Sequence, residues 1–161
     1  MSLIEDALLT DAASSLYEDK AQILQLPMPP TSNHQYSLFR RGRKTYHVPS
    51  PKLKSFQEAM KQWLFSRPPN FLVEKHKVQT WIKEGYVLEI GCLFCFKKKN
   101  LFTKQDVPKR LDVSNRLKAL HDSLCHILEI DDSIFFRVYA EKAIAEDNLD
   151  EMVFVDIFPI R

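Results

Sequence analysis

The sequence lacks the features of membrane-spanning, exported and disulfide-bonded proteins. None of its apolar runs approaches the ~20 residues that a membrane helix requires. The N-terminus is acidic rather than basic, so no signal peptide is expected. The chain has three cysteines, an odd number that argues against a disulfide framework. These absences predict a cytoplasmic protein without a membrane segment.

The cysteines and histidines offer no recognisable metal or redox motif. Cys92 and Cys95 form a C-x-x-C pair, but they lie inside an apolar run at 86–96, where strand geometry points residues three apart to opposite faces. No second pair exists to complete a zinc site. The histidines show no metal-type grouping either: His34, His47, His76, His121 and His126.

Size and charge indicate one domain with an uneven charge distribution. A chain of 161 residues with 45% hydrophobic content is large enough for one core and too short for two. Residues 1–20 carry five acids against one lysine and are expected to form an acidic extension to a domain at 21–161. Residues 40–110 carry 17 Lys and Arg against five acids, which favours a polyanionic partner if these cations share one face. A merely solvated surface is the alternative.

Hydrophobic periodicity and turn residues predict an α+β fold. Strands are expected at 22–26, 45–48, 86–96, 134–141 and 152–160. Helices are expected at 51–66, where Ser50 and Pro51 suit a helix start, and from about 112–115 to 128. The stretch 71–84 is ambiguous.

These elements suggest a mixed, mainly antiparallel sheet with two main helices packed on it, in a single domain. The basic residues at 40–44 fit a loop or hairpin tip before the second strand. An acidic connection at 145–150 suits a hairpin, so the last two strands are expected to be antiparallel neighbours.

Acidic residues flank and line the second helix. On that helix Ser114, Lys118 and Asp122 are spaced four apart and share one stripe, and Asp112 precedes them. Asp131 and Asp132 follow the helix, where the chain must turn. If folding brings them back to the helix start, Asp112 and Asp132 could share a magnesium ion, with Lys118 beside a scissile phosphate.

Ordinary structural roles also explain the same spacing. Asp112 could cap the helix, Lys118 and Asp122 could form a surface ion pair, and Asp131 with Asp132 could form a polar turn. Spacing alone favours this reading, because acids at helix ends are common.

Two motifs resemble the RusA family of Holliday-junction resolvases. The first is Asp112-x-Ser114-Asn115-x-x-Lys118-x-x-x-Asp122-x-Leu124, followed by Asp131-Asp132. It is similar to the family pattern D-x-D-N-x-x-K-x-x-x-D-x-L with a later D-D pair. The second is the proline-rich segment at 26–36, which is similar to the family's P-P-x-x-N-x-x-Y segment and precedes a basic turn. The resemblance spans about 23–158.

This resemblance implies a homodimeric, Mg²⁺-dependent endonuclease that binds four-way DNA junctions by shape and nicks two strands symmetrically, with Mn²⁺ as a substitute ion. The family's metal-binding acids match Asp112, Ser114 and Asp132, with Asp131 as a further candidate, and its essential lysine matches Lys118. Ser114 departs from the pattern, because a neutral hydroxyl is a poorer Mg²⁺ ligand than a carboxylate. The alternative function is therefore a catalytically impaired protein that binds branched DNA.

The basic residues also have two readings. They could follow DNA phosphates in a salt-sensitive, sequence-independent way, or they could form a solvated surface. The candidates for DNA contact are Arg41, Arg43, Lys44, Lys97, Lys98, Lys99, Lys109 and Arg110, with Arg40 beside them. An interaction module unrelated to DNA is a third hypothesis, favoured if junctions do not bind at low salt.

Overall fold

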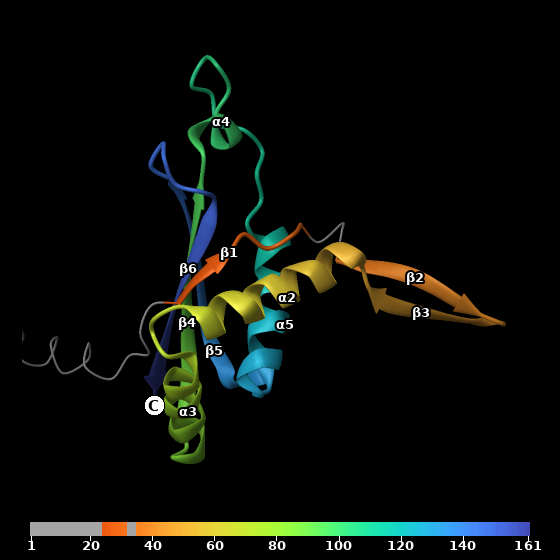
Figure 1. Ribbon diagram of the computed structural model, residues 1–161, viewed down its shortest axis with the longest axis vertical. Coiled ribbons are helices and arrows are strands. Elements are labelled where there is room, and N and C mark those ends of the chain that lie inside the picture. The colour runs from red at the N-terminus through yellow and green to blue at the C-terminus, as the bar shows by residue number, and fades with distance from the viewer. Residues whose placement is uncertain (1–23, 32–34) are drawn as a thin grey trace, which may run out of the picture.

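The computed structural model describes residues 24–31 and 35–161 (Figure 1). The acidic extension expected at 1–20 lies outside these residues. The elements, in chain order, are β1 (Leu24–Pro27), β2 (Tyr36–Arg41), β3 (Lys44–Pro49), α2 (Pro51–Ser66), α3 (Phe71–Lys83), β4 (Val87–Phe96), α4 (Lys98–Leu101), α5 (Ser114–Leu128), the 3₁₀ helix η2 (Asp132–Ile134), β5 (Phe135–Ile144) and β6 (Met152–Ile160).

A four-stranded mixed sheet organises the fold. Its strand order is β1-β6-β4-β5, with β6 antiparallel to both β1 and β4 and with β5 parallel to β4. Strands β2 and β3 form a separate antiparallel hairpin. The prediction of an α+β fold with a mainly antiparallel sheet is confirmed.

The expected pairing of the last two strands is wrong, because β4 lies between them. The parallel pair β4–β5 needs a crossover, which contains α5, and this places β5 on one side of β4 while β6 occupies the other. The acidic connection instead passes around the end of β4. There the Ala145 N–H donates to the Phe96 carbonyl at 2.8 Å, and the Lys97 N–H donates to Glu151 Oε1 at 3.0 Å.

Alternating side chains of β4 and β6 build the core against the helices. On β4, Leu88, Ile90 and Phe94 are fully buried, while Leu93 on the other face is 37% exposed. The helices α2, α3 and α5 supply the facing apolar residues, among them Met60 and Leu120, both 0% exposed. One face of the sheet is therefore covered by helices, with α3 as a third helix in the segment whose structure was ambiguous.

Local signals explain where the helices begin. Ser50 Oγ accepts a hydrogen bond from the Leu53 N–H at 3.1 Å, so the predicted start of α2 is confirmed. Asn70 Oδ1 caps α3 in the same way by accepting from the Leu72 N–H at 3.1 Å. At α5 the cap position is Val113, which makes no side-chain cap bond.

The expected placement of Cys92 and Cys95 on opposite faces of their strand is confirmed. Cys92 is buried against the helices and Cys95 lies on the opposite face, half-buried, with both thiols free. Burial raises the pKa of the Cys92 thiol to about 12, so that thiol stays protonated and unreactive. Across the described part of the chain, none of the helices has the length and apolarity that a bilayer crossing demands.

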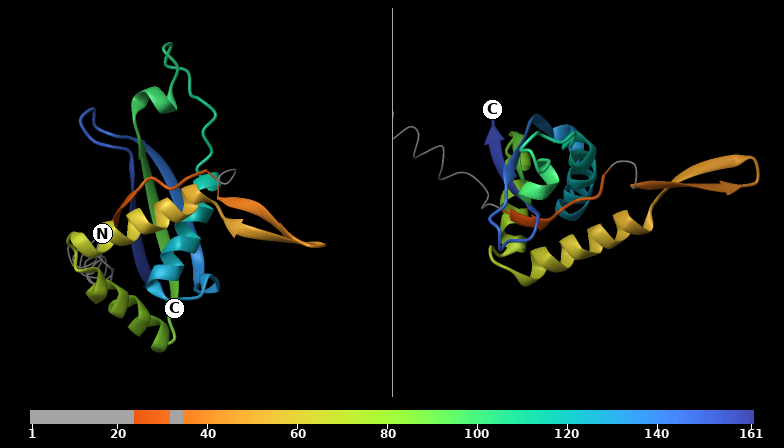
Figure 2. Two further views of the ribbon diagram at one scale, coloured as in Figure 1. Left: turned by 45° about the vertical axis from the view of Figure 1, so that its right-hand side comes forward. Right: turned by 90° about the horizontal axis from the view of Figure 1, so that it is seen from above.

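The β2–β3 hairpin projects from the body of the molecule. Figures 1 and 2 show it extending away from the sheet, beyond the start of α2. Every residue of its two strands is exposed except Val48, which is half-buried. The basic stretch at 40–44 is thus a hairpin tip, and Gly42 takes a positive φ of 63° in its turn.

Candidate active site on helix α5

Three potential metal ligands converge on the third turn of α5. An imidazole nitrogen of His121 and carboxylate oxygens of Asp122 and Asp132 all lie within 4.8 Å of one another. Among residues 24–31 and 35–161 this is the only group of three or more His, Cys, Asp or Glu side chains so arranged. Asp132 is exposed and the other two are half-buried, so the group opens to solvent.

The end of α5 determines where Asp132 lies. Glu129 adopts the left-handed conformation, with φ 57° and ψ 48°, and its N–H closes the last turn on the Cys125 and His126 carbonyls. The chain then reverses into η2, where Asp131 Oδ1 accepts from the Ser133 N–H at 2.9 Å. Asp131 is therefore the cap of η2, and Asp132 returns to the third turn of α5 rather than to its first.

Lys118 and Tyr36 border the same group. Lys118 Nζ lies 3.5 Å from Asp122 Oδ2, one helical turn away. Tyr36, at the base of the hairpin, donates from its hydroxyl to the same oxygen at 3.3 Å. The lysine side chain is 63% exposed and accessible to a polyanion.

Burial favours the neutral form of His121, which lies beside the two carboxylates. Desolvation lowers the pKa of His121, although the nearby charges of Asp122 and Asp132 act in the opposite direction. The imidazole packs on the Phe135 ring at a centroid distance of 4.9 Å. Its Nε2 atom is buried, with no hydrogen-bond partner among the described residues. Neutral imidazole is the form that binds metal ions.

Asp112 and Ser114 form a separate contact at the start of α5. Asp112 Oδ1 accepts from Ser114 Oγ at 2.7 Å and from the Ser114 N–H at 2.9 Å. These bonds, more than the nearby Lys142, lower the pKa of the exposed Asp112 carboxyl. At 1.5 Å per residue, Ser114 and Asp122 are about 12 Å apart along the helix axis.

Asp112 is therefore not part of the convergent group that contains Asp132. That these two carboxylates share an ion stays a prediction. The contacts expected of ordinary structural roles are also present, namely the Asp112 turn, the Lys118–Asp122 pair and the Asp131 cap.

The predicted DNA-contacting residues fall into two regions. Arg41, Arg43 and Lys44 lie at the hairpin tip, whereas the lysines at 97–99 lie around α4, at another extremity of the molecule (Figure 1). Lys98 Nζ pairs with Asp106 Oδ1 at 2.8 Å, and Lys109 Nζ donates to the Lys99 carbonyl at 2.6 Å. The α4 region is thus partly neutralised, while the hairpin strands and tip contain no acid.

His121 and Tyr36 are the residues that sequence reasoning missed. The expectation that the histidines lack a metal-type grouping is wrong for His121, which belongs to the convergent group. Its sequence signal was weak, because Asp132 approaches it only through the left-handed turn at Glu129. Tyr36 is 86 positions from Asp122, so only the tertiary fold joins them.

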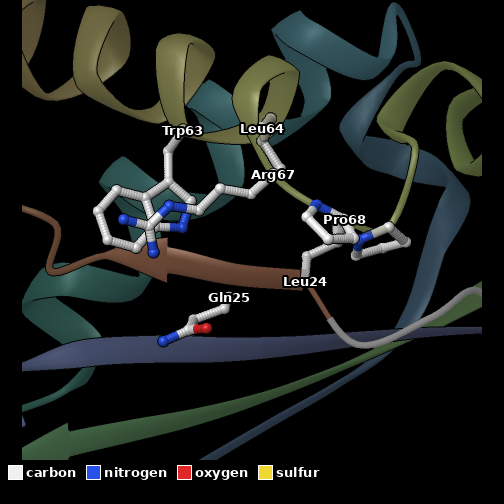
Figure 3. Close-up of a pocket in the computed structure, with 7 residues that line it drawn as sticks. Leu24, Gln25, Trp63, Leu64, Arg67 and Pro68 are labelled. Atoms are coloured by element: carbon white, nitrogen blue, oxygen red, sulfur yellow. The ribbon is translucent and has the colours of Figure 1, made fainter.

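One pocket of the molecule lies away from this group and does not touch it. It is found between β1 and the end of α2, where the Arg67 guanidinium lies 3.4 Å from the centroid of the Trp63 ring (Figure 3). Arg67 and Trp63, which both line the pocket, make a cation–π contact with each other. None of the candidate site residues lines this pocket.

Comparison with known proteins decides the family. The family model of endodeoxyribonuclease RusA matches residues 27–153, most of the chain. The chain belongs to the RusA family. RusA membership implies endodeoxyribonuclease activity on Holliday junctions and binding of branched DNA. The matched range includes the hairpin, α5 and the convergent group.

Comparisons with individual proteins add little to the RusA match. No functionally curated protein matches the chain significantly. Similar solved structures include 2C-methyl-D-erythritol-2,4-cyclodiphosphate synthase with CDP bound, at 14% identity and TM-score 0.30, covering 86% of this chain and 99% of that one. The corresponding synthase from Plasmodium vivax is 14% identical with TM-score 0.30, covering 87% and 93%. Likeness at this level carries no argument about the RusA chain.

Proposed function

We propose that this RusA protein is a metal-dependent endonuclease that resolves four-way DNA junctions, with its metal centre on the third turn of α5. The supporting observation is the convergence of His121, Asp122 and Asp132 within 4.8 Å. Lys118 lies one turn away, at 3.5 Å from Asp122. Carboxylates beside an accessible cation are the groups that phosphodiester cleavage needs.

The residues of this group fit a divalent cation. Two carboxylates supply hard oxygen donors for Mg²⁺ or Mn²⁺. The buried and unpartnered Nε2 of His121 is an orphaned polar atom of a kind that metal binding would relieve. When bound, the ion would supply a hydroxide at neutral pH and offset charge on the phosphate. Because Mg²⁺ strongly prefers oxygen ligands and one donor of this group is an imidazole, we expect Mn²⁺ to support cleavage at least as well.

Each side chain near the ion has a proposed role. Asp132, being exposed, would hold the ion on the side that faces DNA, while Lys118 would contact a phosphate oxygen and stabilise the developing negative charge. Tyr36 orients the Asp122 carboxylate through its hydroxyl. Asp112 and Asp131 remain candidate ligands, at the start of α5 and at the cap of η2.

The direct test measures nicking of a synthetic four-way junction. We expect nicks at symmetric positions with Mg²⁺ or Mn²⁺ and none with EDTA, because the reaction needs the cation. A linear duplex of the same sequence serves as the control substrate. Failure to nick the junction with either ion, by both the wild type and the Ser114→Asp variant, would exclude the nuclease function.

Lys118→Ala should lower the nicking rate by about 100-fold, a typical effect for loss of a group that stabilises transition-state charge. Junction affinity should change much less, since one phosphate contact among many is lost. Single-turnover nicking and electrophoretic mobility shift measure the two quantities. Lys118→Arg is the matched control, because it keeps the positive charge beside Asp122. Equal loss of binding and cleavage would reduce Lys118 to an ordinary phosphate contact.

A homodimer is the assembly we propose for symmetric nicking, since one centre per chain cannot reach two related strands at once. Support comes from β5, an edge strand with exposed apolar side chains at Phe136, Val138, Tyr139 and Ile144. Such an edge is suited to pairing with a second chain.

A DNA substrate also fits the cytoplasmic location expected from the sequence.

A specific contact favours a second candidate, a RusA protein that binds junctions and cleaves poorly. Ser114 occupies a position where the family pattern has aspartate, and its hydroxyl donates to Asp112 at 2.7 Å. That bond engages one oxygen of the Asp112 carboxylate, and the position lacks one negative charge. Binding without nicking by the wild type, with nicking gained in Ser114→Asp, would identify this state.

A further inference from the structure

The β2–β3 hairpin is an arm that begins at the candidate active site. Its base is fixed by Gln35, only 1% exposed, whose Nε2 donates to the Asn115 carbonyl of α5 at 3.0 Å. The Ser50 N–H donates to the Gln35 carbonyl at 2.8 Å, which ties the start of α2 to the same point. Next to this anchor, Tyr36 contacts Asp122 of the convergent group.

The arm reaches well beyond the active site. Six residues in each strand, at about 3.3 Å per residue, give a length of roughly 20 Å. DNA rises about 3.4 Å per nucleotide along a strand, so this length corresponds to roughly six steps. When a phosphate of the DNA is held beside Asp132, the tip can therefore contact a second part of the same DNA molecule.

Both faces of the arm carry exposed apolar side chains. Phe39 pairs with Tyr46 across the strands on one face, at 54% and 46% exposure, and Leu38 is 70% exposed on the other. A two-stranded hairpin has no core to cover these groups and is marginally stable by itself. A partner that covers one face only would leave the other apolar face in water.

The charge on the tip indicates the nature of the partner. Four cations gather within five positions, at Arg40, Arg41, Arg43 and Lys44, and neither strand contains an acid. Such a tip is complementary to phosphates. Aromatic groups close behind a basic tip suit the exposed faces of base pairs, which stack on aromatic rings whatever their sequence.

We propose that the arm enters the branch point of a four-way junction, with Phe39 and Tyr46 stacked against base pairs at the crossover and the basic tip on the phosphates beyond. The inference rests on the junction-binding part of the proposed function and not on cleavage. A branch point presents base-pair faces on both sides of its central opening, which matches an apolar group on each face of the arm. Continuous duplex offers such faces only after unstacking, so the arm selects branched DNA.

The test compares binding to a junction and to a linear duplex of the same sequence, in EDTA so that nicking plays no part. The Phe39→Ala/Tyr46→Ala variant should bind the junction about tenfold more weakly, within the usual range for lost base stacking, and the duplex as well as before. 2-Aminopurine at the branch point should report the contact, by a fluorescence change on binding that this variant loses.

Three further variants keep the test decisive. Phe39→Leu retains an apolar strand residue and should lose part of the junction affinity, even if the double variant disorders the arm. Arg41→Ala/Arg43→Ala should weaken binding to both the junction and the duplex. It should also reduce the salt dependence of the affinity by the equivalent of about two phosphate contacts. Leu72→Ala, an equally exposed apolar residue of α3 at 58%, is the matched control and should change nothing.

Two outcomes overturn the arm's role. Junction and duplex affinities that fall together in the Phe39 and Tyr46 variants would make the arm a general DNA contact. A change in self-association by light scattering, with DNA affinity intact, would make it a contact between two copies of the chain. A wild type that binds junctions selectively but never nicks them defeats the nuclease function and leaves this proposal standing.

Discussion

Asp132→Asn should reduce junction nicking by at least about 100-fold and leave junction affinity unchanged or slightly increased. Mutation of a residue that only orients a metal ligand typically lowers metal affinity or activity by about 10- to 100-fold. Loss of a ligand itself should therefore lower activity by at least the upper end of that range. Binding should not suffer, because a negative charge near the phosphates is removed. Single-turnover nicking and electrophoretic mobility shift measure these two effects, and calorimetric titration should show weakened Mn²⁺ binding.

Matched variants locate the ion on α5. Asp150→Asn removes one charge from the exposed connection between β5 and β6, where the side chain is 96% exposed, and should leave nicking unchanged. Asp131→Asn keeps an acceptor for the Ser133 N–H but removes the negative charge. It therefore distinguishes a role of Asp131 as a metal ligand from its role as the cap of η2. Should Asp112→Asn abolish Mn²⁺ binding while Asp132→Asn does not, the ion is held at the start of the helix instead.

Local patterns predicted much of this fold. The Ser50 and Pro51 signal predicted the observed start of α2, because a cap and a proline act within one helical turn. Alternating burial along β4 likewise follows from its apolar run. The neighbours of β4 could not be read in the same way. The acidic connection after β5 suits a tight hairpin and equally a longer path around the end of β4, and only the parallel crossover through α5 decides between them.

The candidate site shows the same division. Ser114, Lys118 and Asp122 follow one stripe of α5 as the four-residue spacing requires. The return of Asp132 depends on one left-handed residue, Glu129, a conformation that the sequence does not announce with glycine. Because that turn is tight, Asp132 lies close to His121 and Asp122 on the third turn of α5. Asp112, which was predicted to lie beside Asp132, does not belong to this group.

Ser114→Asp should raise the nicking rate by about tenfold or more, because the start of α5 would then carry two carboxylates, at positions 112 and 114. In the wild type, hydrogen bonds from Ser114 lower the pKa of Asp112. A carboxylate at 114 replaces the hydroxyl donor with a like charge beside Asp112, so the pKa of Asp112 should rise when no cation is present. Mg²⁺ would then have two adjacent carboxylates to bind, as the RusA pattern provides.

A thermal melt detects this change without any measurement of activity. Ser114→Asp should melt below the wild type in EDTA, because of the added repulsion, and should gain more stability from Mg²⁺ than the wild type, by about 2.7 kcal/mol at 100 times the dissociation constant of the added site. Ser114→Asn, neutral and of the same shape as aspartate, is the control: it should melt like the wild type in EDTA and gain no more stability from Mg²⁺ than the wild type does. If Ser114→Asp gains no more stability from Mg²⁺ than the wild type and nicks no faster, position 114 has no part in holding the ion. The convergent group around Asp132 must then act alone.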